Sequence, residues 1–212
     1  PPYLKTMVLD SGGFHNAYQC GIRQGGAFEL KQLTWAFKQA QNSPQAKASS
    51  IINEALQAQN IHDWFAKTPW LKGHSPVSSV PEYENYLLEQ WQHGNFDEFW
   101  KKIGIYALGY FDQIPDIPVL CMSSWYDAYV SSTLDNYKAL HSEKTAEQEL
   151  IMGPWLHGDR NTAYSGDVDF GERAFFDGNV APTWLDYRVQ WFKRHLLGEQ
   201  QAKQSPVKIF VM

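Results

Sequence analysis

Residues 125–129 read WYDAY and residues 153–158 read GPWLHG, and each stretch follows a short apolar run. Residues 117–122 (IPVLCM) precede the first stretch, and residues 149–152 (ELIM) precede the second. Apolar runs of this length that end in turn residues are typical of buried strands. Residues 130–140 between them have the composition of a helix. Strand, helix, strand indicates a parallel sheet, so we predict an α/β fold.

This order of elements brings an acid and a base to the same edge of the sheet. Parallel strands joined by one helix run in the same direction, and ligand sites in open α/β sheets lie at their carboxyl ends. Asp127 follows one such end and His157 follows the next. A carboxylate that accepts a hydrogen bond from one imidazole nitrogen fixes the tautomer and leaves the other nitrogen free to take a proton. Two plainer interpretations stay open: Asp127 could cap the following helix, and His157 is one of seven histidines.

The composition excludes several classes of partner. The chain has 212 residues and a net charge of −5, and it contains no basic cluster, which argues against a nucleic-acid partner. No apolar run is long enough to cross a bilayer. Cys20 and Cys121 lack a C-x-x-C pattern, so neither a zinc site nor a disulfide framework is expected. Two buried free thiols are favoured over a bridge between these cysteines.

The first half of the chain reads as one strand followed by helices. Residues 4–9 form a short apolar run that ends at DSGG, a turn signal. Helices are expected over residues 27–40, 45–65 and 82–92, with a short one over 96–103. Residues 26–92 contain no strand candidate, which suggests a helical insertion between segments of the sheet.

The end of the chain predicts one more helix and one more strand. Pro182 opens the helix at a position where its missing N–H costs little, and Gly198 ends it. Four apolar residues fall on one face of this helix, namely Leu185, Val189, Phe192 and Leu196. Residues 207–212 alternate in polarity as a strand does.

Several motifs together resemble those of the cocaine-esterase-like hydrolases, a family that includes X-prolyl dipeptidyl acylaminopeptidases and α-amino acid ester hydrolases. The motifs occur in family order over nearly the whole chain: residues 25–28 (GGAF), 96–100 (FDEFW), 118–127 (PVLCMSSWYD), 153–157 (GPWLH), 166–171 (GDVDFG) and 191–198 (WFKRHLLG). The resemblance implies a partial α/β-hydrolase sheet with an inserted helical cap, truncated at both ends. Residues 1–25 and 96–205 would form the hydrolase core, residues 26–95 the cap, and residues 206–212 the start of a C-terminal β-domain.

The resemblance also implies roles for four residues. Asp127 and His157 match the acid and the base of the family's Ser-Asp-His triad, and Tyr129 and Trp35 match aromatics that line the acyl pocket. The implied substrate is a small ester or a short peptide, with no cofactor, no metal, no nucleic acid and no membrane. Self-association, compartment and the choice between ester and X-Pro peptide stay open.

The chain departs from the family pattern at the nucleophile. It contains no G-x-S-x-G elbow, and Ser11 in DSGG reads as a turn rather than as a substitute. The resemblance implies a serine hydrolase that acts through an acyl-enzyme. Because the nucleophile motif is missing, we expect these 212 residues to be inactive by themselves. The acidic cluster of the amino acid ester hydrolases is not evident after Asp127, which disfavours that branch.

Two other functions compete with this interpretation. The first is a non-catalytic binding module derived from a hydrolase. The second is a metal-dependent hydrolase that uses Asp127, His157 and Asp159.

Overall fold

The computed structural model describes residues 3–202 and 204–212, which form two compact units. One unit contains the chain up to Gly21 together with Trp100–Met212, and the other contains Ile22–Phe99. The predicted cap spanned residues 26–95, so its limits lie within four residues of those of the second unit.

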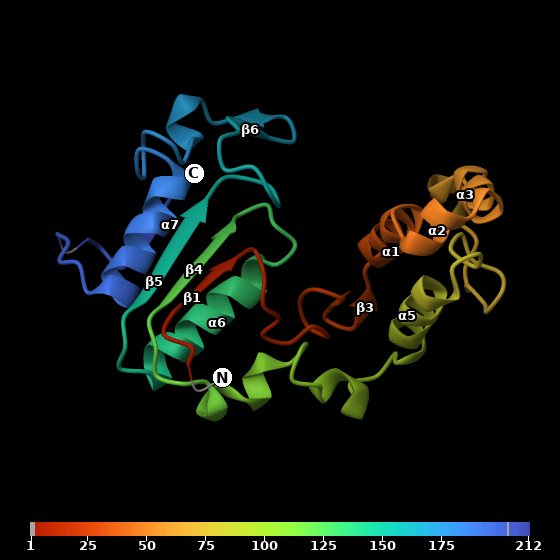
Figure 1. Ribbon diagram of the computed structural model, residues 1–212, viewed down its shortest axis with the longest axis horizontal. Helices are drawn as coiled ribbons and strands as arrows, with labels where there is room; N and C mark the ends of the chain where they lie inside the picture. The colour runs from red at the N-terminus through yellow and green to blue at the C-terminus, as the bar shows by residue number, and fades with distance from the viewer. Residues whose placement is uncertain (1–2, 203) are drawn as a thin grey trace. The chain divides into compact units, whose positions relative to one another are not determined.

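A four-stranded parallel sheet forms the centre of the first unit (Figure 1). Its strands are β1 (Met7–Asp10), β4 (Val119–Ser124), β5 (Gln148–Gly153) and β8 (Val207–Ile209), in the order β1-β4-β5-β8. All three neighbouring pairs are parallel. The α/β fold class predicted from the sequence is therefore confirmed.

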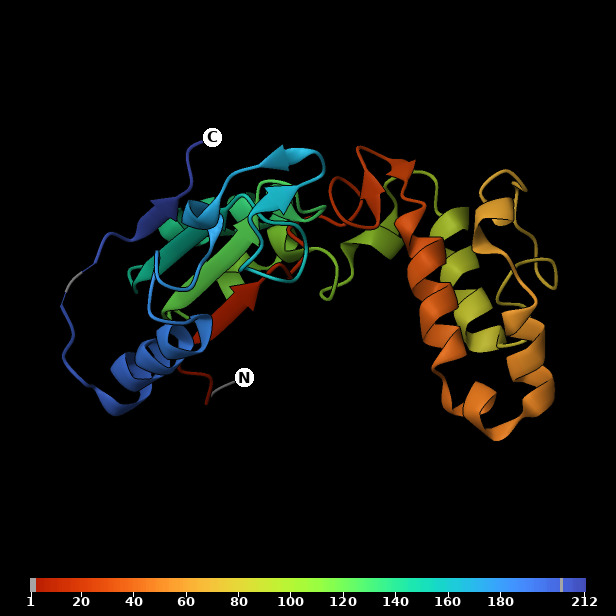
Figure 2. The ribbon, with the colours of Figure 1, turned by 90° about the horizontal axis from the view of Figure 1, so that it is seen from above.

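Helices cover both faces of this sheet (Figures 1 and 2). On one face, Val119 and Cys121 of β4 pack in a cluster with Leu140 of α6 (Val130–Glu143). On the other face, Leu120 packs in a cluster with Trp191 of α7 (Trp184–Phe192). Burial on both faces explains why β4 and β5 read as continuous apolar runs rather than as alternating patterns.

The last strand differs from its sequence prediction. Residues 206–212 were expected to begin a separate β-domain, but β8 pairs in parallel with β5, with Val207 opposite Leu150. The outer edge of β5 offers unpaired backbone groups, and β8 satisfies them as the fourth strand of the hydrolase sheet.

The predicted helix after Pro182 is present, but its apolar stripe faces outward. Leu185 and Leu196 are 63% and 55% exposed, whereas Trp191 is buried against the sheet. The larger ring of Trp191 removes more apolar area from water, so it decides which side of the helix packs. A π-helical turn (Lys193–Leu197) extends α7, and Gly198 ends it in the left-handed conformation with φ of 71°.

The second unit is a helical bundle with its own core. Its helices are α1 (Lys31–Gln41), α2 (Pro44–Ala48), α3 (Ser50–Gln57), α4 (Ile61–Trp64) and α5 (Pro81–Gln92). Buried side chains of these helices and of the segment between α4 and α5 form one cluster, which includes Leu33, Leu56, Trp64, Trp70, Val77 and Leu87.

One predicted helix is in fact three. Residues 45–65 were expected to form a continuous helix, but Ser49 and Asn60 interrupt it. The Ser49 hydroxyl accepts a hydrogen bond from the Ile52 N–H and caps α3, and the Asn60 side chain caps α4 in the same way through the His62 N–H. Short polar side chains compete for backbone N–H groups, which is why they favour helix starts over helix interiors.

Short elements complete the described structure. Contrary to the prediction, residues 26–92 contain a strand, because β2 (Arg23–Gln24) and β3 (Ala27–Phe28) pair as a small hairpin. The short helix expected over residues 96–103 is a 3₁₀ turn, Glu98–Lys101. The remaining elements are the 3₁₀ turns Ala107–Gly109, Phe111–Gln113 and Glu172–Ala174 and the two-stranded β6 (Tyr164–Ser165) and β7 (Val168–Asp169).

A buried carboxylate ties α7 and β8 to β5. Glu149 is 2% exposed; it accepts hydrogen bonds from Arg194 Nη2 and from the Tyr187 hydroxyl, each at 2.7 Å. Lys208 of β8 in turn donates to the Tyr187 hydroxyl at 3.0 Å. Burial acts to raise the pKa of Glu149, but the two hydrogen bonds and the charges of Arg194 and Lys208 outweigh it and hold the pKa below its ordinary value of 4.5. Burial, together with the bond to Glu149, raises the pKa of Tyr187.

We predict that Glu149→Gln lowers the free energy of unfolding at pH 7 by on the order of 2 kcal/mol, since it weakens charge-assisted hydrogen bonds. A depressed folded-state pKa stabilises the protein above the unfolded-state value, and this contribution is lost as the pH falls through the folded-state value. The difference from wild type should therefore shrink below pH 4.5. Urea unfolding at a series of pH values measures it, and the exposed Glu143→Gln is the matched control. A difference independent of pH would contradict the prediction.

Candidate active site

Asp127 lies in the turn between β4 and α6, at the carboxyl edge of the sheet. Its side chain is 0% exposed, and its N–H donates to the Ser124 carbonyl at 3.1 Å. Oδ1 accepts a hydrogen bond from the Tyr129 N–H at 2.8 Å. Oδ2 lies 3.0 Å from Nδ1 of His157. The carboxylate therefore makes a local turn contact and also contacts the predicted base, but it does not cap α6, whose N-cap residue is Tyr129 without a side-chain cap bond.

His157 lies in the loop after β5 and presents its ring to solvent. Its side chain is 61% exposed, although its Nδ1 edge is held by Asp127. Among the described residues, Asp127 is the only hydrogen-bond partner of this ring. In the neutral ring, Nδ1–H donates to the carboxylate and Nε2 keeps a lone pair that can accept a proton.

The sheet register brings these two residues together. Ser124 at the end of β4 lies opposite Gly153 at the end of β5, so the turns that carry Asp127 and His157 leave the sheet side by side. Gly153 also makes room for the next part of the loop, since a Cβ at this position would lie 2.3 Å from the Trp155 ring. The Trp155 ring is buried, and its Nε1 donates to the Ala174 carbonyl.

The two predicted substrate-binding aromatics lie in different units. The Tyr129 ring packs edge-on against the His157 ring with centroids 5.4 Å apart, and against Phe14 at 5.6 Å. Trp35 is 47% exposed on α1 and contacts the Tyr86 ring at 5.1 Å within the helical unit. A shared pocket for Trp35 and Tyr129 stays a prediction.

Ser11 is engaged elsewhere in the structure. It is buried, and its hydroxyl accepts a hydrogen bond from Arg160 Nη2. Its φ of 49° is in the left-handed region, which agrees with the turn predicted for DSGG.

Arg160 was not predicted from the sequence, yet it bonds Asp10 at the end of β1, Ser124 at the end of β4 and the Leu156 carbonyl in the loop after β5. An arginine three residues after the base was visible in the sequence, but its partners Asp10 and Ser124 are distant along the chain and gave no local signal.

Asp127, His157 and Asp159, the ligands of the metal-dependent alternative, are not arranged together around a possible metal position. Asp159 Oδ1 accepts a hydrogen bond from the Asn161 N–H, which is a local turn contact. In the part of the chain that the structure describes, no group of three or more His, Cys, Asp or Glu side chains is arranged to hold a metal ion.

Both cysteines are buried and unpaired with each other, as predicted. Burial raises the pKa of the Cys121 thiol to about 12. Across residues 3–202 and 204–212, no helix combines the length and the apolar character needed to span a bilayer.

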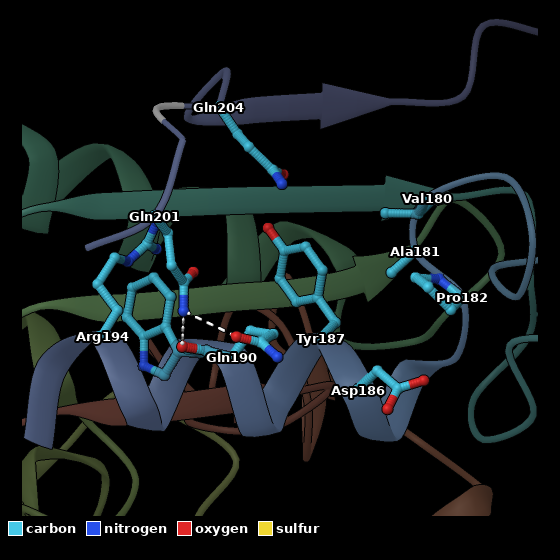
Figure 3. Close-up of a pocket in the computed structure, with 10 residues that line it drawn as sticks. Val180, Ala181, Pro182, Asp186, Tyr187, Gln190, Arg194, Gln201 and Gln204 are labelled. Carbon is cyan, nitrogen blue, oxygen red and sulfur yellow. Dashed lines mark hydrogen bonds between the residues drawn. The ribbon is translucent and has the colours of Figure 1, made fainter. Parts of the chain in front are cut away.

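A separate pocket of about 450 Å³ lies beside α7 (Figure 3). Tyr187 and Gln190 of α7 line it, and Gln201 donates hydrogen bonds to both the carbonyl and the side-chain oxygen of Gln190. Neither Asp127 nor His157 is among its lining residues. The carboxyl edge of the sheet, rather than this pocket, therefore holds the candidate acid and base.

The parallel sheet, the helices on both of its faces and the long helical insertion between β1 and β4 define the class: this is an α/β-hydrolase fold. Residues 1–159 match the sequence profile of the X-Pro dipeptidyl-peptidase family, S15. The chain belongs to this family, and the resemblance inferred from its motifs is confirmed.

Known proteins that are similar to the chain include an esterase and an aminopeptidase. Cocaine esterase of Rhodococcus sp. (strain MB1 Bresler) is 31% identical over 124 residues, which cover 57% of this chain and 20% of that enzyme. The crystal structure of an aminopeptidase from a marine sediment Thaumarchaeota archaeon matches 98% of this chain with a TM-score of 0.62 at 17% identity. The chain spans 33% of the aminopeptidase structure, and its match covers 20% of cocaine esterase. It therefore corresponds to one part of each of these longer proteins.

We predict that Asp127→Asn reverses the tautomer of His157. The Tyr129 N–H needs the side-chain oxygen as its acceptor, so the amide NH₂ would face His157 Nδ1 and force that nitrogen to accept. The ring proton would then move to Nε2. Nitrogen-15 chemical shifts of the imidazole above its titration range measure this change.

Asp135→Asn is the matched control, because Asp135 lies on the exposed side of α6 and pairs with Lys138. A His157 ring that keeps its proton on Nδ1 in Asp127→Asn would show that the carboxylate does not set the tautomer.

Proposed function

We propose that this chain supplies the acid and the base of a serine hydrolase that cleaves an ester or an X-Pro peptide bond through an acyl-enzyme. The observation that carries the proposal is the 3.0 Å contact between Asp127 Oδ2 and His157 Nδ1. The acid is fully buried and the base is exposed, as an orienting carboxylate and a reactive imidazole require.

In the proposed reaction, the serine, His157 and Asp127 each have a separate task. A serine supplied from outside these 212 residues gives its proton to His157 Nε2 and attacks the carbonyl carbon of the substrate. Asp127 stabilises the imidazolium that forms and stays ionised. His157 then protonates the leaving alcohol or amine, which leaves the acyl group on the serine. Water attacks this ester with His157 again as the base and releases the acid product.

The substrate class follows from the family and from the rings near the base. The family name refers to X-Pro dipeptides, and the relative with 31% identity is an esterase. Both reactions pass through a tetrahedral oxyanion, whose backbone donors we place outside this segment. Tyr129, which packs against His157, would contact the acyl group, and the resemblance assigns Trp35 to substrate binding as well.

The alternative is a binding module in which Asp127 and His157 are relics of an ancestral hydrolase. The 3.0 Å contact between a fully buried carboxylate and an imidazole that is 61% exposed argues against it, because a binding module without catalysis does not need this arrangement. Measured turnover separates the two hypotheses.

In the longer hydrolase that contains these residues, His157→Ala should lower kcat for an aryl ester by on the order of 10⁶-fold, because the group proposed to take the serine proton is lost. Release of the phenol measures the rate. His141→Ala is the matched control, since His141 is exposed on α6 and stacks on Tyr137. Activity retained in His157→Ala would remove His157 from the mechanism.

We also predict that a fluorophosphonate probe leaves the 212-residue chain unlabelled. The Ser11 hydroxyl is buried against Arg160, and among the described residues no hydroxyl or thiol is hydrogen-bonded to His157. Mass spectrometry of the treated chain measures the adduct, with the longer hydrolase as the positive control. An adduct on Ser11 would identify a nucleophile within this chain.

A further inference from the structure

We infer that Arg160 is a positioning residue that fixes the acid and the base relative to each other. It would do so by joining the base loop, residues 154–160 after β5, to the acid turn, residues 125–129 between β4 and α6. This inference rests on the proposed function, because it assigns Arg160 a task in the same site.

One nitrogen of the guanidinium bonds the base loop and Ser124, the last residue of β4, which directly precedes the acid turn. Arg160 Nη1 donates to the Leu156 carbonyl and to the Ser124 hydroxyl, each at 2.9 Å. The Leu156 carbonyl and the His157 N–H share one planar peptide group, so holding the first fixes the direction in which His157 leaves the backbone. The Ser124 carbonyl accepts from the Asp127 N–H at 3.1 Å, so holding Ser124 fixes the start of the acid turn.

The second nitrogen anchors this connection to β1. Arg160 Nη2 donates to Asp10 Oδ1 and to the Ser11 hydroxyl. The Ser11 N–H in turn donates to the Met122 carbonyl of β4 at 2.8 Å. The Asp10 carboxylate offsets the charge of the buried guanidinium, which would otherwise be costly to remove from water.

Because Arg160 is buried, a positioning role can be distinguished from a role in substrate binding. Arg160 is 4% exposed, and its guanidinium lies 5.7 Å from the centre of the Trp155 ring. It therefore offers almost no surface to a substrate, and its loss should change kcat rather than KM. Lysine keeps the charge but has no planar fork, so it cannot reach all four acceptors at once.

Arg160→Lys tests the inference in two ways. In the longer hydrolase it should lower kcat by on the order of 10²-fold and leave KM for an aryl ester within about twofold, because a small displacement of the base is enough to slow proton transfer. In the 212-residue chain, nitrogen-15 shifts of His157 should show a mixture of tautomers in place of the Nδ1–H form.

Arg194→Lys is the matched control for lost stability. Arg194 bonds Glu149 at the opposite end of β5 from the base loop, in the same unit. We expect it to lower the unfolding midpoint without changing kcat or the His157 tautomer. A fall in kcat as large as that of Arg160→Lys would mean that general loosening explains both.

A second variant covers the case in which Arg160→Lys does not fold. Asp10→Asn keeps the acceptor oxygen on a side chain that is 31% exposed and removes only its charge, so it should lower kcat in the same direction by a smaller factor. Wild-type kcat in a folded Arg160→Lys, or in Asp10→Asn if the first is unfolded, overturns the inference. Such a result would not contradict the proposed function, provided that His157→Ala is inactive. An active His157→Ala overturns the proposed function and the catalytic role of Arg160 with it.

Discussion

Because α6 returns the chain to the starting edge of the sheet, β4 and β5 pair in parallel with Ser124 opposite Gly153. The site depends on this register. A slip of one residue would turn every side chain of one strand to the other face and would separate the Asp127 turn from the His157 loop. The register is stable because both faces of β4 are buried, by the cluster that contains Leu140 on one side and by the cluster that contains Trp191 on the other.

Buried polar groups add directional constraints to this apolar framework. Glu149 ties α7 and β8 to the beginning of β5, and Arg160 ties three segments together at its end. Each is a charged group with several hydrogen-bond partners, which is the condition under which a buried charge is tolerated. Apolar packing alone would fix the layers but not the few tenths of an ångström that proton transfer between side chains requires.

In the candidate site, the acid is held rigidly and the base is accessible. Asp127 is immobilised on both oxygens, by the Tyr129 N–H and by His157, while the outer face of the imidazole is open. An orienting acid works best when it cannot exchange partners with water, and a base works only if a hydroxyl can reach it. The proposed acid is therefore held in one position, and the proposed base keeps a ring that a hydroxyl can approach.

The sequence by itself determined the fold class, the helical insertion and the pairing of Asp127 with His157, because buried parallel strands and strand-end turns are encoded in neighbouring residues. It misplaced residues 206–212 as a separate domain, merged three helices over residues 45–65 into one and missed Arg160. The helix breaks at Ser49 and Asn60 follow from local cap hydrogen bonds, whereas the pairing of β8 and the partners of Arg160 were decided only by the tertiary structure. The free edge of β5 pairs with β8 from more than fifty residues away, and Asp10 lies 150 residues from its partner Arg160. Contacts that distant leave no periodicity in a single sequence, since the chain must fold before the groups that make them can meet.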